Sequence, residues 1–95
     1  MQVGRIVGTV VSSQKDPSLV GMKLQVVEQT DLMGKPKGSY VIAVDSVGAG
    51  VGELVLYAAG SSARQTDMTR DKPVDTVIMS IVDSITVKDE LLFRK

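Results

Sequence analysis

Five aspartates spread along the chain are the candidates for acid–base chemistry. A general acid or base must lie within hydrogen-bond reach of the group it serves, so a paired spacing would be the first sign of such a site. The spacing selects no pair among them: they are Asp31, Asp45, Asp67, Asp75 and Asp83. We therefore interpret each as a turn cap or a surface charge.

Two residue types that carry much of hydrolase and metal chemistry are missing. The sequence has no histidine and no cysteine. Ser-His-Asp and Cys-His arrangements, histidine-based metal sites and thiolate zinc sites are therefore excluded, and so is a disulfide framework. We predict that the protein is not an enzyme and that it holds no cofactor and no metal.

A glycine-rich segment, Gly48-Ala49-Gly50-Val51-Gly52, resembles a loop that cradles nucleotide phosphates. That mechanism needs a helix N-terminus behind the loop, but residues 53–57 are apolar and β-prone. A dinucleotide site is therefore rejected. Three explanations for the glycines stay open, namely positive φ angles, a very close backbone approach, for example around a symmetry axis, and a glycine-rich hairpin turn.

A second polar run contains Ser61, Ser62 and Arg64. Hydroxyl and guanidinium groups are natural donors to an oxyanion, so these side chains could form an anion pocket. Such a run is more often a hydrogen-bonded loop at an interface. Both interpretations stay open from the residues alone.

The charge balance limits the kinds of partner. Eleven Lys and Arg match eleven Asp and Glu, so the basic surface typical of nucleic-acid binding is missing. Tyr40, Tyr57 and Phe93 are the only aromatic residues, which is few for a platform that stacks bases. A small barrel that binds single-stranded nucleic acid remains the alternative function.

The elements that carry these loops are predicted to be strands. The sequence is 43% hydrophobic but only 3% aromatic, so the core must be built from aliphatic side chains, and the abundant β-branched residues favour strands. The segments with strand patterns are 2–13, 22–29, 39–47, 53–57, 77–87 and 91–93. One helical turn could begin near Pro73, because proline suits the first position of a helix.

The third predicted strand alternates between two faces. Side chains on opposite faces of a strand follow a period of two, which sorts its residues into two sets: Tyr40, Ile42 and Val44 on one side, and Val41, Ala43 and Asp45 on the other. Short strands at this spacing predict an all-β fold, either a small barrel or a sandwich, and a barrel would leave no exposed edges. Ninety-five residues fit one domain.

The first residues, Met1-Gln2-Val3-Gly4-Arg5, lack the basic, apolar and small-residue zones of a signal peptide. No apolar run is long enough to cross a bilayer. We therefore expect a cytoplasmic protein with no membrane partner.

Two signatures in this chain resemble those of one known family. The first is Val44-Asp45-Ser46-Val47-Gly48-Ala49-Gly50-Val51-Gly52-Glu53, and the second is Gly60-Ser61-Ser62-Ala63-Arg64. Further matches are Gly8-Thr9-Val10-Val11-Ser12-Ser13-Gln14-Lys15, residues 21–24, and Pro73-Val74-Asp75 leading into Ile81-Val82-Asp83. This ordered set spans nearly the whole chain, and it resembles the vertex proteins of bacterial microcompartments, the pentameric shell proteins of carboxysomes and of ethanolamine and propanediol metabolosomes.

The resemblance implies an all-β fold, a five-stranded barrel like the oligonucleotide-binding (OB) fold with at most one short helix, spanning residues 1–95 as a single vertex domain. It also implies a cyclic homopentamer that caps the vertices of a polyhedral shell beside hexameric shell proteins. Flat layers of hexagonal tiles cannot close a shell, so five-fold units must stand at its corners. The family has no catalytic residue to carry over, and it implies no nucleic-acid partner.

The resemblance also assigns roles to the two signatures. The loop close to the five-fold axis, here called the glycine loop, would consist of Ser46, Val47, Gly48, Ala49, Gly50, Val51 and Gly52. The subunit contacts would include Gly60, Ser61, Ser62, Ala63 and Arg64. Arg64 would donate hydrogen bonds across the interface.

Overall fold

The computed structural model describes residues 1–60 and 75–95. Within these ranges the elements are β1 (Gln2–Val10), the 3-10 helix η1 (Pro17–Leu19), β2 (Leu24–Thr30), β3 (Pro36–Asp45), β4 (Leu54–Ala59), β5 (Thr76–Ile81), β6 (Ser84–Val87) and β7 (Glu90–Arg94). Strands therefore dominate the described part of the chain, and η1 is three residues long. The predicted all-β class with at most one short helix is confirmed.

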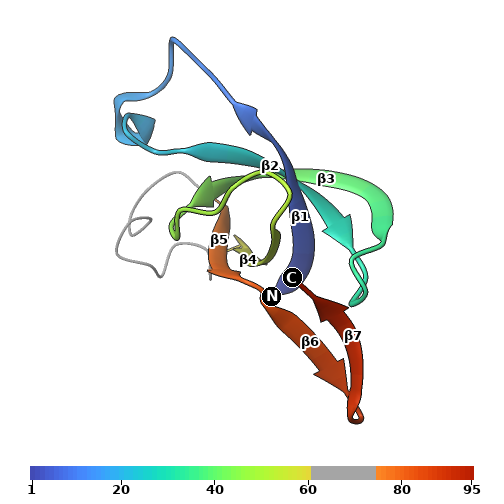
Figure 1. The fold of residues 1–95 in the computed structure, drawn as a ribbon. Helices are drawn as coiled ribbons and strands as arrows, with labels where there is room; N and C mark the ends of the chain where they lie inside the picture. The colour runs from blue at the N-terminus through green and yellow to red at the C-terminus, as the bar shows by residue number, and fades with distance from the viewer. Residues whose placement is uncertain (61–74) are drawn as a thin grey trace.

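Five of the strands form a closed barrel in the order β1-β2-β3-β5-β4 (Figure 1). The barrel closes because β4 pairs with β1 as well as with β5, in both cases antiparallel. The pair β3–β5 is parallel, with Val44 opposite Val77 and Asp45 opposite Ile78. This closed five-stranded sheet confirms the predicted OB-like barrel. The β3–β5 pair is short, so most of β3 is paired only on its β2 side.

The interior of the barrel is filled mainly by aliphatic side chains. The cluster consists of Ile6, Val27, Ala43, Ala49, Val55, Tyr57 and Ile78. Each of these residues is at most 1% exposed. Full burial of one such Val or Ile side chain stabilises the fold by about 1.5–3 kcal/mol before entropy is counted, so this cluster is the main source of stability of the barrel.

The alternation predicted for the third strand is confirmed by burial. Ala43 lies in the barrel interior, with Val41 packed against the same cluster, whereas Tyr40 and Ile42 are 61% and 49% exposed on the outer face. Val44 also points outward, but it is buried in a second cluster with Ala58 and Val77. The barrel therefore has one covered and one uncovered region on its outside.

The cover of the second cluster comes from the connection between β1 and β2. Leu19, at the end of η1, and Met22 pack against the cluster. Pro17 begins η1, and the Asp16 side chain caps it by accepting a hydrogen bond from the N–H of Ser18 at 2.9 Å. The sequence predicted a plain turn here, because a single capped turn of helix has no periodicity to detect.

Several predicted strand boundaries were wrong. The third strand spans Pro36–Asp45, not residues 39–47. The first strand ends at Val10, not at residue 13. The segment 77–87 is divided between β5 and β6, because the N–H of Val82 still donates to Leu54 of the barrel at 2.8 Å whereas β6 pairs with β7. The helical turn predicted near Pro73 lies outside the described residues.

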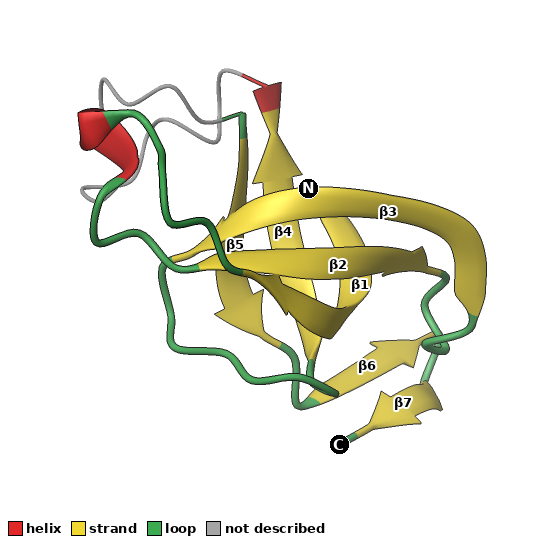
Figure 2. Cartoon of the chain, turned by 90° about the horizontal axis from the view of Figure 1, so that it is seen from above, coloured by secondary structure: helices red, strands yellow, loops and turns green. Residues whose placement is uncertain are grey.

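The strands β6 and β7 form a separate two-stranded hairpin. The η1 segment and this hairpin project from opposite ends of the barrel (Figures 1 and 2). Lys88 and Asp89 form the tip of the hairpin, both with positive φ angles, 50° and 64°, which fits the primed turn that matches the twist of a hairpin.

Candidate functional site

The glycine loop connects β3 to β4, and these strands are not neighbours in the barrel, because β5 lies between them. A hairpin turn joins two paired strands, so the hairpin-turn explanation of the glycines is wrong. Beside β5, the hydroxyl of Ser46 donates a hydrogen bond to the carbonyl of Ile78. Strand β4 begins at Leu54, directly after the loop, so the helix required by a dinucleotide site is absent from this described segment.

The middle of the loop inserts one side chain into the barrel. Ala49 is fully buried and belongs to the interior cluster, whereas Val47 and Val51 on either side are 39% and 64% exposed. The loop therefore covers part of the barrel interior with its central alanine and presents two apolar side chains outward.

Asp45 and Gln25 fix the first half of the loop. The Oδ1 atom of Asp45 accepts hydrogen bonds from the N–H groups of Val47 and Gly48, both at 3.0 Å. The buried Nε2 of Gln25 donates to the carbonyl of Ala49 at 3.0 Å, while its Oε1 accepts from the Thr9 hydroxyl at 2.9 Å. Buried polar groups must be hydrogen-bonded. The Gln25 amide meets this requirement by bonding the loop backbone, and the bond orders the loop.

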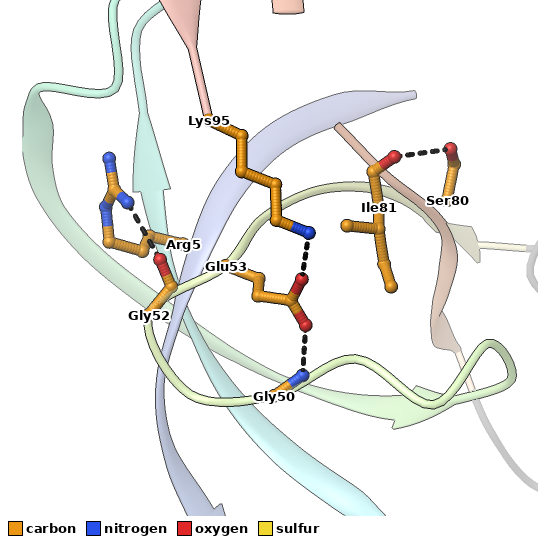
Figure 3. Close-up of polar contacts among 7 residues, drawn as sticks. All are labelled: Arg5, Gly50, Gly52, Glu53, Ser80, Ile81 and Lys95. Atoms are coloured by element: carbon orange, nitrogen blue, oxygen red, sulfur yellow. Dashed lines mark hydrogen bonds and ion pairs between the residues drawn. The ribbon is translucent and has the colours of Figure 1, made fainter. Parts of the chain in front are cut away.

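Glu53 and Arg5 fix the second half (Figure 3). Glu53 Oε1 accepts from the N–H of Gly50 at 2.7 Å, and Oε2 accepts from Lys95 Nζ at 2.7 Å. The Lys95 hydrogen bond, followed by that from Gly50, lowers the pKa of the Glu53 carboxyl below its ordinary value. Arg5 Nη1 donates to the carbonyl of Gly52 at 2.9 Å.

The glycines of the loop have two different structural reasons. Gly48 and Gly52 have φ angles of +75° and +95°, a region that side-chain-bearing residues rarely adopt. Gly50 has no positive φ, and a Cβ atom added there would meet only Glu53 Oε1, at 3.5 Å. Nothing in the described part of one chain therefore demands glycine at position 50.

The second signature is described only at its first residue. Gly60 is exposed, has a φ angle of +70°, and donates its N–H to the carbonyl of Asp75 at 2.7 Å. Ser61, Ser62, Ala63 and Arg64 lie outside the described residues. The anion-pocket and interface interpretations of this run both stay predictions.

The aspartates give no catalytic arrangement in the described ranges. Asp45 caps the glycine loop, and Asp31 Oδ1 accepts from the N–H groups of Met33 and Lys35, which confirms these two as turn caps. Residues 1–60 and 75–95 contain no group of three or more acidic side chains placed to hold a metal ion. No helix in the same ranges has the length and apolar character to span a membrane. Asp67 lies outside the described residues.

Sequence reasoning missed four residues that hold the loop, namely Arg5, Gln25, Glu53 and Lys95. Their partners are distant along the chain or are backbone atoms, so no motif indicates these contacts, although Glu53 ends the first signature. Only Asp45 carried a signal, because an aspartate before a run of small residues is typical of a turn in which the side chain bonds the backbone.

Comparison with known proteins assigns the family. A family model described as ethanolamine utilisation protein EutN/carboxysome matches residues 1–83, which include both signatures and the whole barrel. The chain belongs to this family of microcompartment vertex proteins. The resemblance stated from the sequence is thereby confirmed.

Individual members of the vertex family match over most of the chain. The carboxysome shell vertex protein CcmL of Gloeobacter violaceus is 46% identical over 95 residues, covering 100% of this chain and 95% of the relative. The solved structure of Gloeobacter violaceus CcmL has a TM-score of 0.95, at coverages of 100% of this chain and 98% of that chain. The microcompartment shell vertex protein PduN of Salmonella typhimurium is 44% identical over 90 residues, covering 90% of this chain and 99% of the relative.

One further solved structure bears on assembly. The GrpN pentameric microcompartment shell protein from Rhodospirillum rubrum has a TM-score of 0.84 and 42% identity, and the match covers 92% of this chain and 99% of that chain. The names of these relatives describe structural shell proteins, not enzymes.

Proposed function

We propose that this chain assembles into a cyclic homopentamer that caps the vertices of a bacterial microcompartment and closes its shell. The observation that carries the proposal is the similarity, over 92% of the chain and at 42% identity, to a shell protein named as pentameric. Hexameric shell proteins of the same compartment would surround the pentamer. The role is structural, so the proposal includes no catalytic residue, cofactor, metal, nucleic acid or membrane.

The uncovered outer face of the barrel supports self-association. Ile42 of β3 lies opposite Val26 of β2, and Val26 lies opposite Gly8 of β1. On this face Val7, Tyr40 and Ile42 are 40%, 61% and 49% exposed. Association with a second copy would remove this apolar surface from water, which is the main favourable term in most protein association. A ring needs such a contact to be heterologous, so a different surface of the next subunit would meet it.

Within the ring, the glycine loop would lie close to the five-fold axis. Two features support this placement: the exposed apolar side chains Val47 and Val51, and the glycine at position 50 that the described chain does not itself require. The residues from Gly60 to Arg64 would contribute to subunit contacts, with Arg64 donating hydrogen bonds to the neighbouring subunit. The whole of residues 1–95 would act as one vertex domain.

The aromatic residues count against the alternative of single-stranded nucleic-acid binding. Tyr57 is 1% exposed and its hydroxyl donates to Gln2 at 2.9 Å, while Phe93 lies under the Arg5 guanidinium. Tyr40 alone is widely exposed. Binding of single strands usually depends on several aromatic rings that stack successive bases, so this surface is poorly suited to it.

The mass of the purified protein in solution tests the proposal. Native mass spectrometry should show a species of five times the chain mass of 10.1 kDa. Electron microscopy of the protein expressed with hexameric shell proteins should then show closed particles, whereas the hexameric proteins alone should give open sheets or tubes. A stable monomer with a salt-sensitive affinity for a single-stranded oligonucleotide would contradict the proposal and support the alternative function.

A further inference from the structure

The end of the glycine loop is connected to the β6–β7 hairpin through a single carboxylate. The two oxygens of Glu53 have different partners, Gly50 of the loop and Lys95, which follows β7 (Figure 3). Both contacts are 2.7 Å long. Hydrogen bonds that involve ionised groups are stronger than neutral ones, so this carboxylate is suited to order both segments at once.

Lys95 is itself held in place by the base of the hairpin. Its backbone N–H donates to the carbonyl of Asp83, just before β6, at 2.8 Å. Arg5 adds a second connection, because it bonds the Gly52 carbonyl at 2.9 Å and its guanidinium carbon lies 5.9 Å from the centre of the Phe93 ring of β7. This separation is within the range of a cation–π attraction. The hairpin therefore reaches the loop at two points.

The two halves of the loop are held by different parts of the molecule. Asp45 holds the first half from the end of β3, and the buried Gln25 holds it from inside the barrel. The second half depends on Glu53, on Arg5, and on the N–H of Gly52 donating to the carbonyl of Ile6 at 2.8 Å. A change in the hairpin should thus affect residues 50–52 and leave residues 46–49 in place.

We propose that the β6–β7 hairpin sets the conformation of residues 50–52, with Glu53 as the positioning residue and with Lys95–Glu53 and Phe93–Arg5 as the two connections. Glycine-rich backbone has many accessible conformations, so a loop of defined shape needs contacts that select one of them. The lowered pKa of Glu53 is consistent with a carboxylate that stays ionised between its two donors. The effect of this loop shape on the ring rests on the proposed function, but the connections themselves lie within one chain.

Selective labelling with ¹⁵N-glycine makes the proposal testable, because only nine glycine amides would appear in the spectrum. Glu53→Ala should speed hydrogen exchange of the Gly50 amide about tenfold, since it removes the charged acceptor. Lys95→Met should speed the same exchange by about threefold, since an exposed ion pair contributes less. Gly48 should be unchanged in both variants.

Two controls separate the connection from a general effect of charge. Lys95→Arg keeps a cation beside Glu53 and should give a spectrum close to that of the unchanged protein. Lys15→Met removes the same charge from an exposed position in the β1–β2 connection and should leave Gly50 unaffected. Added salt should move the Gly50 signal of the unchanged protein towards that of Lys95→Met, because side chains that are 52% and 24% exposed are screened by salt.

A Gly50 amide with the same signal and exchange rate in Lys95→Met as in the unchanged protein would overturn the proposal. The solution mass of the same samples separates this outcome from failure of the proposed function. A monomer whose Gly50 responds to Lys95→Met would refute the pentamer and support the connection. A pentamer whose Gly50 does not respond would refute the connection alone.

Discussion

The side-chain amide of Gln25, buried in β2, donates to the carbonyl oxygen of Ala49 at 3.0 Å. Gln25→Leu keeps a similar volume but leaves that carbonyl and the Thr9 hydroxyl without this partner, so we expect a loss of about 2 kcal/mol in the free energy of unfolding. Urea unfolding measures it as a lower midpoint. Gln14→Leu, at an exposed position, is the control and should change stability by less than about 0.5 kcal/mol. Equal stability of the two variants would refute the bridging role of Gln25.

Gly4 and Gly8 lie on the same strand but differ in the space around them. A Cβ atom on Gly4 would lie 2.5 Å from Val27 Cγ1 and 2.8 Å from the backbone oxygen of Glu28, whereas one on Gly8 would be 3.8 Å from its nearest neighbour, Val26. Gly4→Ala should therefore destabilise the barrel by about 2 kcal/mol or more, since overpacking forces the strands apart. Gly8→Ala should be neutral or slightly stabilising in the same urea titration. The idea of a close approach at Gly4 fails if both variants unfold at the same midpoint.

Much of the barrel could be predicted from local patterns. The alternation from Tyr40 to Asp45 identified the strand and its two faces, because one face meets the interior cluster. The division at residues 82–83 could not be predicted, because Val82 and Ile85 continue a strand pattern while the chain leaves the barrel between them. The 3-10 turn at Pro17–Leu19 is likewise too short to have a period of its own.

The candidate site was predicted as a segment but not as a constellation. The glycines marked the loop, whereas several residues that fix it come from β1, from β2 and from Lys95 after β7. Such contacts depend on the barrel order, which places β1 beside β4 and so brings Arg5 opposite Leu54. The spacing of residues along the sequence does not reveal the order of the strands in the barrel.

Substitutions at Gly48 and Gly50 distinguish what the fold of one chain requires from what assembly of a ring requires. Gly48→Val should destabilise the chain itself by about 1–2 kcal/mol, because its φ of +75° disfavours any side chain. Gly50→Val has no such penalty, so the chain should still fold with normal circular dichroism but should no longer give the pentameric mass. Normal pentamers from Gly50→Val would argue against a loop close to the axis.

The pH dependence of the free energy of unfolding should include a contribution from ionisation of the Glu53 carboxyl. A carboxyl whose pKa is lower in the folded state stabilises the fold above its ordinary value, here 4.5, and this stabilisation is lost as the pH falls through the lowered value. Hydrogen bonds also lower the pKa values of Asp16 and Asp31, so acid weakens the fold through several groups. Urea unfolding between about pH 7 and about pH 3 should show a flatter dependence for Glu53→Gln.

Lys95 should make the free energy of unfolding fall as the pH rises at high pH, whereas Glu53 makes it fall as the pH decreases. The bond to Glu53 raises the Lys95 pKa above its ordinary value of 10.5. Its stabilisation is therefore present below that value and is lost as the pH rises through the raised pKa. Lys95→Met should flatten the alkaline side of the profile, and Glu90→Gln, an exposed charge in β7, serves as the control for both variants. Profiles of Glu53→Gln and Lys95→Met that match the unchanged protein would exclude the ion pair in solution.

The tip of the β6–β7 hairpin carries backbone strain that glycine would relieve. Asp89 has a φ of 64°, in a region that costs a residue with a side chain about 1–2 kcal/mol. Asp89→Gly should therefore slow hydrogen exchange within the hairpin several-fold, which reports local opening. Glu90→Gly places the same residue in β7, where glycine weakens a strand, and should speed that exchange. If both substitutions shifted exchange in the same direction, the conformation of the turn would differ from the one described.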